Sequence, residues 1–437
     1  MTTFDRFERD LPVVLEELYV GPMPHYRDDI LGQTAATSQR PGWSFPERWL
    51  PMSAITERLA PAPRLPWRTI GAVAIIVLAL IAGALFIVGN QPKRLPAPFG
   101  PAANGQIAYA ADGDIFTADP TTGDSRALVT GPGIDTDPVY SRDGTKIAFT
   151  RTVAGGQREV YTADVDGGAA VLVTPEPISS VSGYEFSPDG TTIAIASMAT
   201  GPLEPDSPVV VLQERISLAN VDGSGLRSLG IEGPARAPSF RPPDGREIAF
   251  EGGSPSEGEG IFAYDLEAGS LRTIVEPTAG FEVTGGPSFS PDGSKIAYGW
   301  WGAAAGPNSR LYVIDADGAG TPLLVEPPVS NLLCCEGGQI AWSNDGTRLA
   351  HFRIYDDGGV VAITRWDTGG TGIELKSPAM DDASLTWSPD DRYLLVRPTD
   401  AAESALEQVL FDAQHGATVP TAWTTTSTPS WQRVAIK

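Results

Sequence analysis

One short motif in this sequence has residue types that could do chemistry. It is Ser-Pro-Asp-Gly, found in SFSPDGSKIAYGW at residues 288–300. Its aspartate could hold a ligand or metal ion, or it could bond to nearby backbone N–H groups in a tight turn. Related segments occur six times, with turn residues Asp143-Gly144, Asp189-Gly190, Asp244-Gly245, Asp292-Gly293, Asp345-Gly346 and Asp390-Asp391. Six copies favour a structural turn over a single catalytic carboxylate, because Pro fixes φ and Gly accepts the left-handed conformation.

A second acidic motif, Asp-x-Asp-Gly, occurs at 164–167 and 315–318 and resembles the start of a calcium-binding loop. Such a loop needs a bidentate Glu at its twelfth position. Pro175 stands there in the first copy, and Glu326 stands in an apolar strand context in the second. The two cysteines are adjacent, so the sequence has no Cys/His spacing suited to zinc. We therefore expect hairpin turns, no metal site and no cofactor.

The three histidines, His25, His351 and His415, lie far apart in the sequence. No serine stands in a Gly-x-Ser-x-Gly elbow, and no segment resembling an α/β-hydrolase domain follows the repeats. A Ser-His-Asp set assembled from several repeats stays open as an alternative. The expectation is a protein without enzymatic activity, and the alternative is a hydrolase or lyase that acts on envelope polymers.

The six motif segments lie 45 to 55 residues apart, which is the period of a repeat array. In each segment an aromatic residue precedes the turn, and a strand such as Ile296-Ala297-Tyr298 follows it. Two more strands follow in each unit. The first is apolar, as in 311–318, and the second is short, as in 170–174. Four strands in a unit of this length predict the blade of a β-propeller.

The ends of the array carry complementary halves of one more unit. GQIAYA at 105–110 matches the strand after a turn, and PSWQ at 429–432 matches the strand before one. Six whole units and this divided one predict an all-β, seven-bladed propeller over residues 104–437. The C-terminal strand is expected to close the ring, because closure removes exposed sheet edges.

The repeated SPDGxxIAF units, followed by strands ending in Asp-x-Asp-Gly, resemble the WD40-like repeats of the TolB propeller family. The resemblance covers about residues 104–436. It implies a binding platform whose partner differs from one member to another. The family's namesake is a soluble periplasmic protein with fewer blades and an additional α/β domain, so its partner is not carried over to this chain.

Long, individual segments are expected on the face opposite the turns: 199–213, 252–260, 300–309 and 327–338. Specific recognition is therefore expected on that face. Trp300 and Trp301 could stack on a flat ligand or pack between blades. Cys334 and Cys335 could form a vicinal disulfide or remain buried thiols. These four residues are the candidate binding residues, and the partner is expected to be a protein or an envelope polymer.

Residues 69–89, TIGAVAIIVLALIAGALFIVG, are apolar throughout and about 31 Å long as a helix, which predicts a single membrane span. Four arginines precede the span within about 20 residues, whereas Lys93 and Arg94 follow it. This bias predicts a cytoplasmic N-terminus and an extracytoplasmic propeller in the plasma membrane. Residues 90–103 are then a Pro-rich linker.

Residues 1–68 are nearly neutral, with 8 Lys/Arg and 9 Asp/Glu, and the remainder has 23 basic and 45 acidic residues. So acidic a surface disfavours nucleic-acid binding. Helical spacing of Leu11, Val14, Leu15 and Leu18 predicts a short helical segment within 1–68. Its layout is similar to the cytoplasmic tails of anti-sigma-type proteins but lacks their zinc pattern. It could pack at the membrane or bind a cytoplasmic regulator.

Overall fold

The computed structural model describes residues 99–174, 180–202, 210–254, 258–302, 310–325, 332–334, 340–355, 358–369, 372–377, 380, 382–399 and 408–436, together with Val77. Residues 1–68 lie outside this part of the chain, as do the expected span at 69–89, apart from Val77, and most of the linker. Within the described residues, no helix has both the length and the apolar character needed to cross a bilayer.

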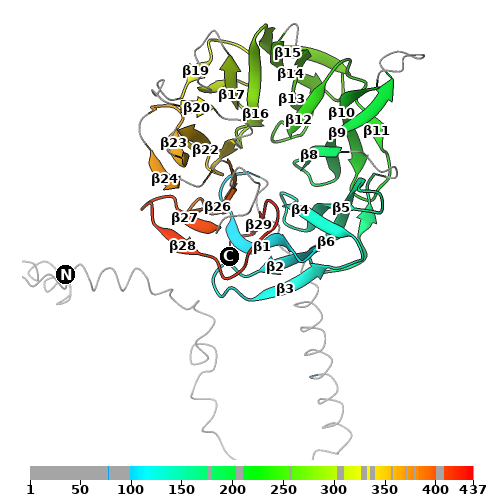
Figure 1. Cartoon of the computed structure of the whole chain (residues 1–437), viewed down its shortest axis with the longest axis vertical. Helices are drawn as coiled ribbons and strands as arrows, with labels where there is room; N and C mark the ends of the chain where they lie inside the picture. Colours follow the sequence, from blue (N-terminus) through cyan, green and yellow to red (C-terminus); the bar gives the residue numbers. More distant parts are fainter. Residues whose placement is uncertain are drawn as a thin grey trace, which may run out of the picture. The chain divides into compact units, whose positions relative to one another are not determined.

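The described chain forms seven antiparallel sheets in a ring (Figure 1). Blade 1 contains β29 (Ser430–Val434), β1 (Ala103–Ala111), β2 (Asp114–Ala118) and β3 (Ser125–Val129). Blade 2 contains β4 (Ile134–Tyr140), β5 (Lys146–Thr152), β6 (Arg158–Asp164) and β7 (Val171–Leu172). Blade 3 contains β8 (Ser180–Phe186), β9 (Thr192–Pro202), β10 (Val210–Asn220) and β11 (Arg227–Ser228). Blade 4 contains β12 (Ala235–Phe240), β13 (Glu247–Ser254), β14 (Gly258–Asp265) and β15 (Ser270–Thr278).

The remaining three blades complete the circle. Blade 5 contains β16 (Phe281–Phe289), β17 (Lys295–Gly302), β18 (Arg310–Asp315) and β19 (Leu323–Leu324). Blade 6 contains β20 (Leu332–Cys334), β21 (Ile340–Trp342), β22 (Arg348–Tyr355), β23 (Gly358–Arg365) and β24 (Ile373–Ser377). Blade 7 contains β25 (Asp382–Trp387), β26 (Tyr393–Thr399), β27 (Val409–Asp412) and β28 (Thr418–Pro420). The predicted all-β, seven-bladed propeller is confirmed.

The ring is closed by the two ends of the array. The C-terminal strand β29 pairs antiparallel with β1, and Trp431 lies opposite Ile107. The red and cyan strands meet at the bottom of the ring in Figure 1. Both residues belong to the apolar cluster that blade 1 shares with blade 7. The predicted division of one blade between the two ends is therefore observed.

The blades are held together by apolar clusters, and the described residues form seven of them, one at each boundary between neighbouring blades. The large-small-large pattern of the repeats explains this arrangement. Side chains alternate across a strand, so Ile296 and Tyr298 face blade 4, whereas Ala297 faces blade 6. The strand that follows each turn thus supplies apolar side chains to both faces of its blade.

The innermost strands are less regular than the repeat predicted. From Thr136 to Val139, β4 advances three positions, while β5 advances only two, from Thr150 to Ala148. One residue of β4 therefore bulges out of the ladder. Asp137 occupies the bulge with φ 55°. Similar register shifts occur in β8, β12 and β16.

Blade 6 differs from the predicted four strands. Its innermost strand is divided into β20 and β21, which both pair with β22. From Cys334 to Ile340 the chain advances six positions, while the partner advances only three, from Ile354 to His351. The three extra residues cannot join the ladder, and this excess explains why the strand is divided.

The Ser-x-Asp-Gly segments form turns that share one hydrogen-bond pattern. In five of them the Ser hydroxyl donates to the Asp Oδ1 at 2.6 Å. The same oxygen accepts the backbone N–H two residues later, as in Asp292 with Ser294 at 3.0 Å. In the variant with an extra proline the Gly245 N–H bonds to the Arg241 carbonyl, one residue further back than in the others. The antiparallel strands place all these turns on one side of the ring, here called the turn face, and the opposite side is the loop face.

Asp391 replaces the turn glycine in blade 7 and has φ 59°. It is 5% exposed, and its carboxylate accepts the Asn344 N–H at 2.6 Å, the Asn344 Nδ2 at 2.9 Å and the Asp345 N–H at 2.8 Å. This aspartate therefore joins the turns of blades 6 and 7 in addition to forming its own.

We predict that Asp391→Gly, which restores the residue of the other blades, lowers the free energy of unfolding by about 1–3 kcal/mol. The reason is that three partly buried donors, two on Asn344 and one on Asp345, lose their buried acceptor, and this loss exceeds the relief of the positive φ. Asp112→Gly is the matched control, since Asp112 is exposed and also has a positive φ of 51°. Thermal unfolding of both variants checks this, and equal or greater stability of Asp391→Gly would contradict it.

Candidate functional site

Trp300 and Trp301 are neighbours in β17, so their side chains lie on opposite faces of the sheet. Trp300 is on the face directed at blade 4, and its ring centroid lies 5.1 Å from that of Phe281 and 6.1 Å from that of Tyr298, both of blade 5. Trp301 shares the face of Ala297, which is directed at blade 6. The structure therefore does not bring the two indoles together as one stacking surface.

The adjacent cysteines are the second pair of candidate binding residues. Cys334 is the last residue of β20, and its backbone pairs with Ile354. Its side chain and the whole of Cys335 lie outside the described residues, so their oxidation state stays a prediction.

The repeated aspartates are not assembled into one site. The turn carboxylates other than Asp391 are bonded within their own blades, and the Asp-x-Asp-Gly aspartates Asp164 and Asp315 form ion pairs with Lys146 and Lys295. Within the part of the chain that the structure describes, no group of three His, Cys, Asp or Glu side chains is placed to hold a metal ion.

The two described histidines belong to different blades. His351 is 5% exposed in β22, with Nε2 3.2 Å from the Thr364 hydroxyl. His415 is in the turn after β27, with Nδ1 3.2 Å from the Asp412 carboxylate. His25 lies outside the described residues.

Charged side chains toward the loop face are held in ion pairs. The fully buried Asp135 accepts two hydrogen bonds from Arg151, at 2.6 and 2.7 Å. Arg236 pairs with Glu251 and Glu259 and lies 3.3 Å from Glu214. Burial raises the pKa of Glu251 to about 7, although the Arg236 charge opposes the shift. These ion pairs fix the positions of the charged side chains toward the loop face, because a buried charge needs a partner.

The central end of blade 3 carries an unusual carboxyl group. Glu185 of β8 accepts the Phe240 N–H of blade 4 at 2.8 Å. At two other blade boundaries the hydroxyls of Ser430 and Ser239 accept the corresponding backbone N–H. Burial raises the pKa of Glu185 to about 7, opposed by that hydrogen bond and by the Arg142 charge.

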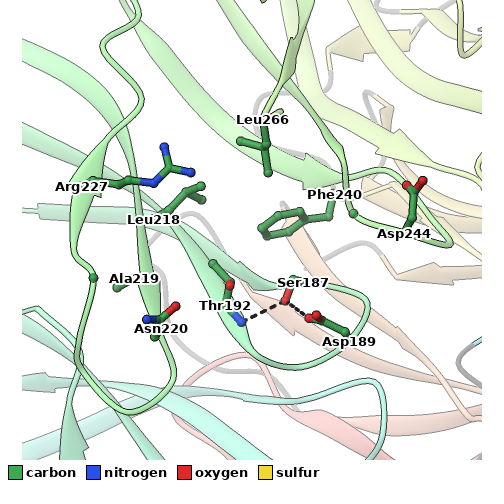
Figure 2. A pocket seen from close by; sticks show the side chains of 12 residues that line it. Ser187, Asp189, Thr192, Leu218, Ala219, Asn220, Arg227, Phe240, Asp244 and Leu266 are labelled. Carbon is green, nitrogen blue, oxygen red and sulfur yellow. Dashed lines mark hydrogen bonds between the residues drawn. The ribbon is translucent and has the colours of Figure 1, made fainter. Parts of the chain in front are cut away.

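Hollows between blades lie on the turn face. One of about 180 Å³ separates blades 3 and 4, and Figure 2 shows Phe240 and Leu266 on one side and Leu218 with Arg227 on the other. The Ser187 hydroxyl there is bonded to Asp189 and Thr192, so the turn itself forms the floor. A second hollow, of about 450 Å³, lies between blades 4 and 5 and is more open.

A third hollow, here called the blade 5/6 cleft, has about 340 Å³ and is lined mainly by apolar groups. Trp342 and Trp366 form its aromatic wall, with ring centroids 6.1 Å apart and planes at 70°. The Lys295 ammonium lies 5.6 Å from the centre of the Trp366 ring. This volume falls within the usual range of ligand pockets, and few large rings line the other two hollows.

The opposite wall of the cleft comes from the beginning of the described chain. Residues Phe99 to Ala102, here called the strap, run across the turn face, and three of them line the cleft. The Arg142 guanidinium lies 5.7 Å from the Phe99 ring centre, and Arg433 Nη2 donates to the Gly100 carbonyl at 2.6 Å. The Ala102 N–H donates to the Pro389 carbonyl at 2.8 Å. The strap is thus bound to three blades.

Sequence reasoning missed this cleft, because specific recognition was expected on the loop face. The signal was Trp366, which follows β23 where the corresponding residues of other blades are smaller: Val165, Val221, Leu266, Ala316 and Ala413. A large ring at this repeat position in blade 6, where these other blades have smaller residues, is the feature of the sequence that marks the site.

Comparison with solved structures supports the fold. A prolyl endopeptidase structure superposes with a TM-score of 0.54 at 14% identity, covering 82% of this chain and 55% of that one. An oligogalacturonate lyase in complex with manganese has a TM-score of 0.51 at 15% identity, covering 76% and 88%. TolB from Acinetobacter baumannii has a TM-score of 0.42 at 17% identity, covering 81% and 71%. No protein-family model and no curated protein sequence matches the chain. The two likenesses with TM-scores above 0.5 show the propeller fold, and the chain spans about half of the peptidase.

We predict that Glu185→Gln changes how stability depends on pH. The folded-state pKa of Glu185, about 7, lies above its ordinary value of 4.5, so the native carboxyl keeps its proton over this interval. Wild-type stability therefore falls as pH rises from about 4.5 to 7, by at most about 3 kcal/mol, whereas a glutamine has no proton to lose.

Melting temperatures of both proteins across this interval check the prediction. The variant should gain stability relative to wild type as pH rises, while the contribution of Glu251 cancels in the difference. A difference that does not change with pH would refute the shift.

Proposed function

We propose that this protein is a membrane-anchored, extracytoplasmic propeller that binds a protein or an envelope polymer without enzymatic activity. The observation that carries the proposal is the blade 5/6 cleft, which combines ligand-pocket size with an aromatic wall of Trp342 and Trp366. Tryptophan has only two side-chain torsions, so it supplies a large contact area at little entropic cost, and this favours recognition.

The closed ring supports the proposal by giving the cleft rigid walls. Trp366 Nε1 donates to the Gly346 carbonyl at 2.9 Å, and Trp342 Nε1 donates to the Ser288 carbonyl of blade 5 at 3.0 Å. Each indole is therefore held in one orientation before any ligand arrives. A site organised in advance loses less entropy on binding.

The anchor in this proposal is the apolar segment 69–89, with the N-terminus in the cytoplasm and the propeller outside. As a variant of the proposal, residues 1–68 bind a cytoplasmic regulator and the protein is a transmembrane sensor. The strap supports this variant, because it is the covalent continuation of residues 1–98 and also lines the cleft.

The second candidate is a hydrolase or lyase on envelope polymers. It is favoured by fold neighbours that include an oligogalacturonate lyase and peptidases, and by two carboxyl groups with a pKa of about 7, Glu185 and Glu251. The two sit in different blades, and Glu251 is only 6% exposed and paired with Arg236. The ion-pair geometry therefore favours a structural role for it.

For topology, we predict that protease added to intact cells degrades the propeller. The basis is the excess of arginine before the apolar segment, which retains the N-terminus in the cytoplasm. Immunoblotting with an antibody to the propeller checks this, and full protection until the cells are lysed would show the opposite orientation.

For binding, we predict that a photo-crosslinking amino acid in place of the exposed Ser294, at the rim of the cleft, yields a discrete adduct in intact cells. Trp366→Ala should abolish the adduct because it removes one wall. Crosslinker in place of Ser270, an exposed residue of the outer strand β15, is the control and should give none. Absence of any Ser294-specific adduct, or release of fragments from envelope polymers by the purified chain, would overturn the proposal.

A further inference from the structure

The blade 5/6 cleft offers ring faces rather than hydrogen-bonding groups. Its walls present Trp342, Trp366, Phe99, Pro291 and Pro101. Flat ring faces set at an angle are suited to proline rings, and the extended polyproline conformation binds in aromatic grooves of this kind because little backbone entropy is lost.

The polar groups of the cleft are already engaged with the protein. Both indole N–H groups donate to backbone carbonyls. The carboxylates of Asp292 and Asp345 accept hydrogen bonds within their own turns, and the Asn344 amide donates to Asp391 and to the Ser388 carbonyl. A saccharide has many hydroxyl groups, and those placed against the ring faces would lose water without gaining partners, which is costly. A proline-rich segment has no such requirement, because proline lacks an N–H.

The rim of the cleft is anionic. Asp292 and Asp345 are exposed, and hydrogen bonds to the carboxylate, from Ser290 and Ser343 first, lower the pKa of each despite partial burial. The nearby cations are already engaged: Lys295 is paired with Asp315, Arg433 donates to Asn344 and to the Gly100 carbonyl, and Arg142 lies against the Phe99 ring. The rim therefore attracts a basic residue beside the apolar groove.

One wall of the cleft is itself a segment of this kind. The strap contributes Phe99, Gly100 and Pro101, which lie against the turns of blades 5 and 6. The turn surface therefore already accommodates a segment that contains proline and an aromatic residue and bends at Gly100, where φ is 78°, and the groove beside the strap has room for another segment.

We propose that the blade 5/6 cleft binds an extended, proline-rich peptide segment of a partner protein, with lysine or arginine flanking the prolines. This proposal rests on the proposed binding function and adds the class of ligand. The aromatic walls hold the proline rings, and the carboxylates of Asp292 and Asp345 attract the flanking cations. Residues 92–98 of the chain, PKRLPAP, have the same composition and are the competing occupant that the experiment must separate.

The experiment uses the full chain in detergent micelles and a fluorescein-labelled peptide, RPLPPLPKR, followed by fluorescence anisotropy. Saturable binding is expected, and Trp366→Ala should weaken it about tenfold or more, the loss typical of a buried aromatic anchor. Trp366→Phe should retain most of the affinity because a ring remains. Trp301→Ala is the matched control, because Trp301 stands near the loop-face end of β17 and is not among the residues that line the cleft, so affinity should be unchanged.

Charge is tested separately. Asp292→Asn keeps an oxygen for the turn but removes the negative charge, so affinity for the basic peptide should fall about threefold. A peptide with glutamate in place of its basic residues should bind more weakly than the basic one. Circular dichroism and thermal unfolding of each variant show that the propeller is intact.

Three outcomes would overturn the proposal. If only a Pro92→Ser/Pro96→Ser/Pro98→Ser variant binds the peptide, the chain's own linker occupies the cleft. If an envelope oligosaccharide binds and Trp366→Ala abolishes that binding, the ligand is a glycan. If neither wild type nor the linker variant binds peptide while the Ser294 adduct persists, the ligand class is wrong but the binding function stands.

Discussion

The pairing of β29 with β1 is the constraint on which the rest of this structure depends. Six blades are continuous in sequence, but the seventh exists only when the last strand joins the first. Without that pairing, β1 and β29 would both expose unpaired backbone groups and one apolar cluster would lie open. Each blade buries its faces only against its neighbours, so the ring is stable as a whole rather than blade by blade.

A ring built in this way leaves different freedom on its two faces. On the turn face, the Ser and Asp side chains shape the turns, and Asp391 also ties the turns of blades 6 and 7 together. Individual character arises there from the residues that flank the turns, and Trp366 is the clearest example. A common architecture with one enlarged residue can thereby form a site without a long insertion.

Much of the fold followed from the repeat. The period, the turn chemistry and the complementary ends were sufficient for seven blades and their closure, because these depend on local patterns that recur. The bulge at Asp137 and the divided strand of blade 6 were not predictable, since they reflect how many residues one strand has relative to its partner. The separation of Trp300 from Trp301 has another cause, because neighbouring residues in a strand have side chains on opposite faces. The blade 5/6 cleft was missed because its walls come from residues about 240 to 270 positions apart, Phe99 on one side and Trp342 and Trp366 on the other.

The strap has a mechanical meaning. The chain that precedes the propeller is continuous with β1, and Arg433 of β29 holds the strap at the Gly100 carbonyl. A pull on the N-terminal side would therefore be borne first by this hydrogen bond and then by the β1–β29 ladder, loaded along the strands so that several bonds share the force. The two ends of the chain lock each other, and tension applied to one is resisted by the other.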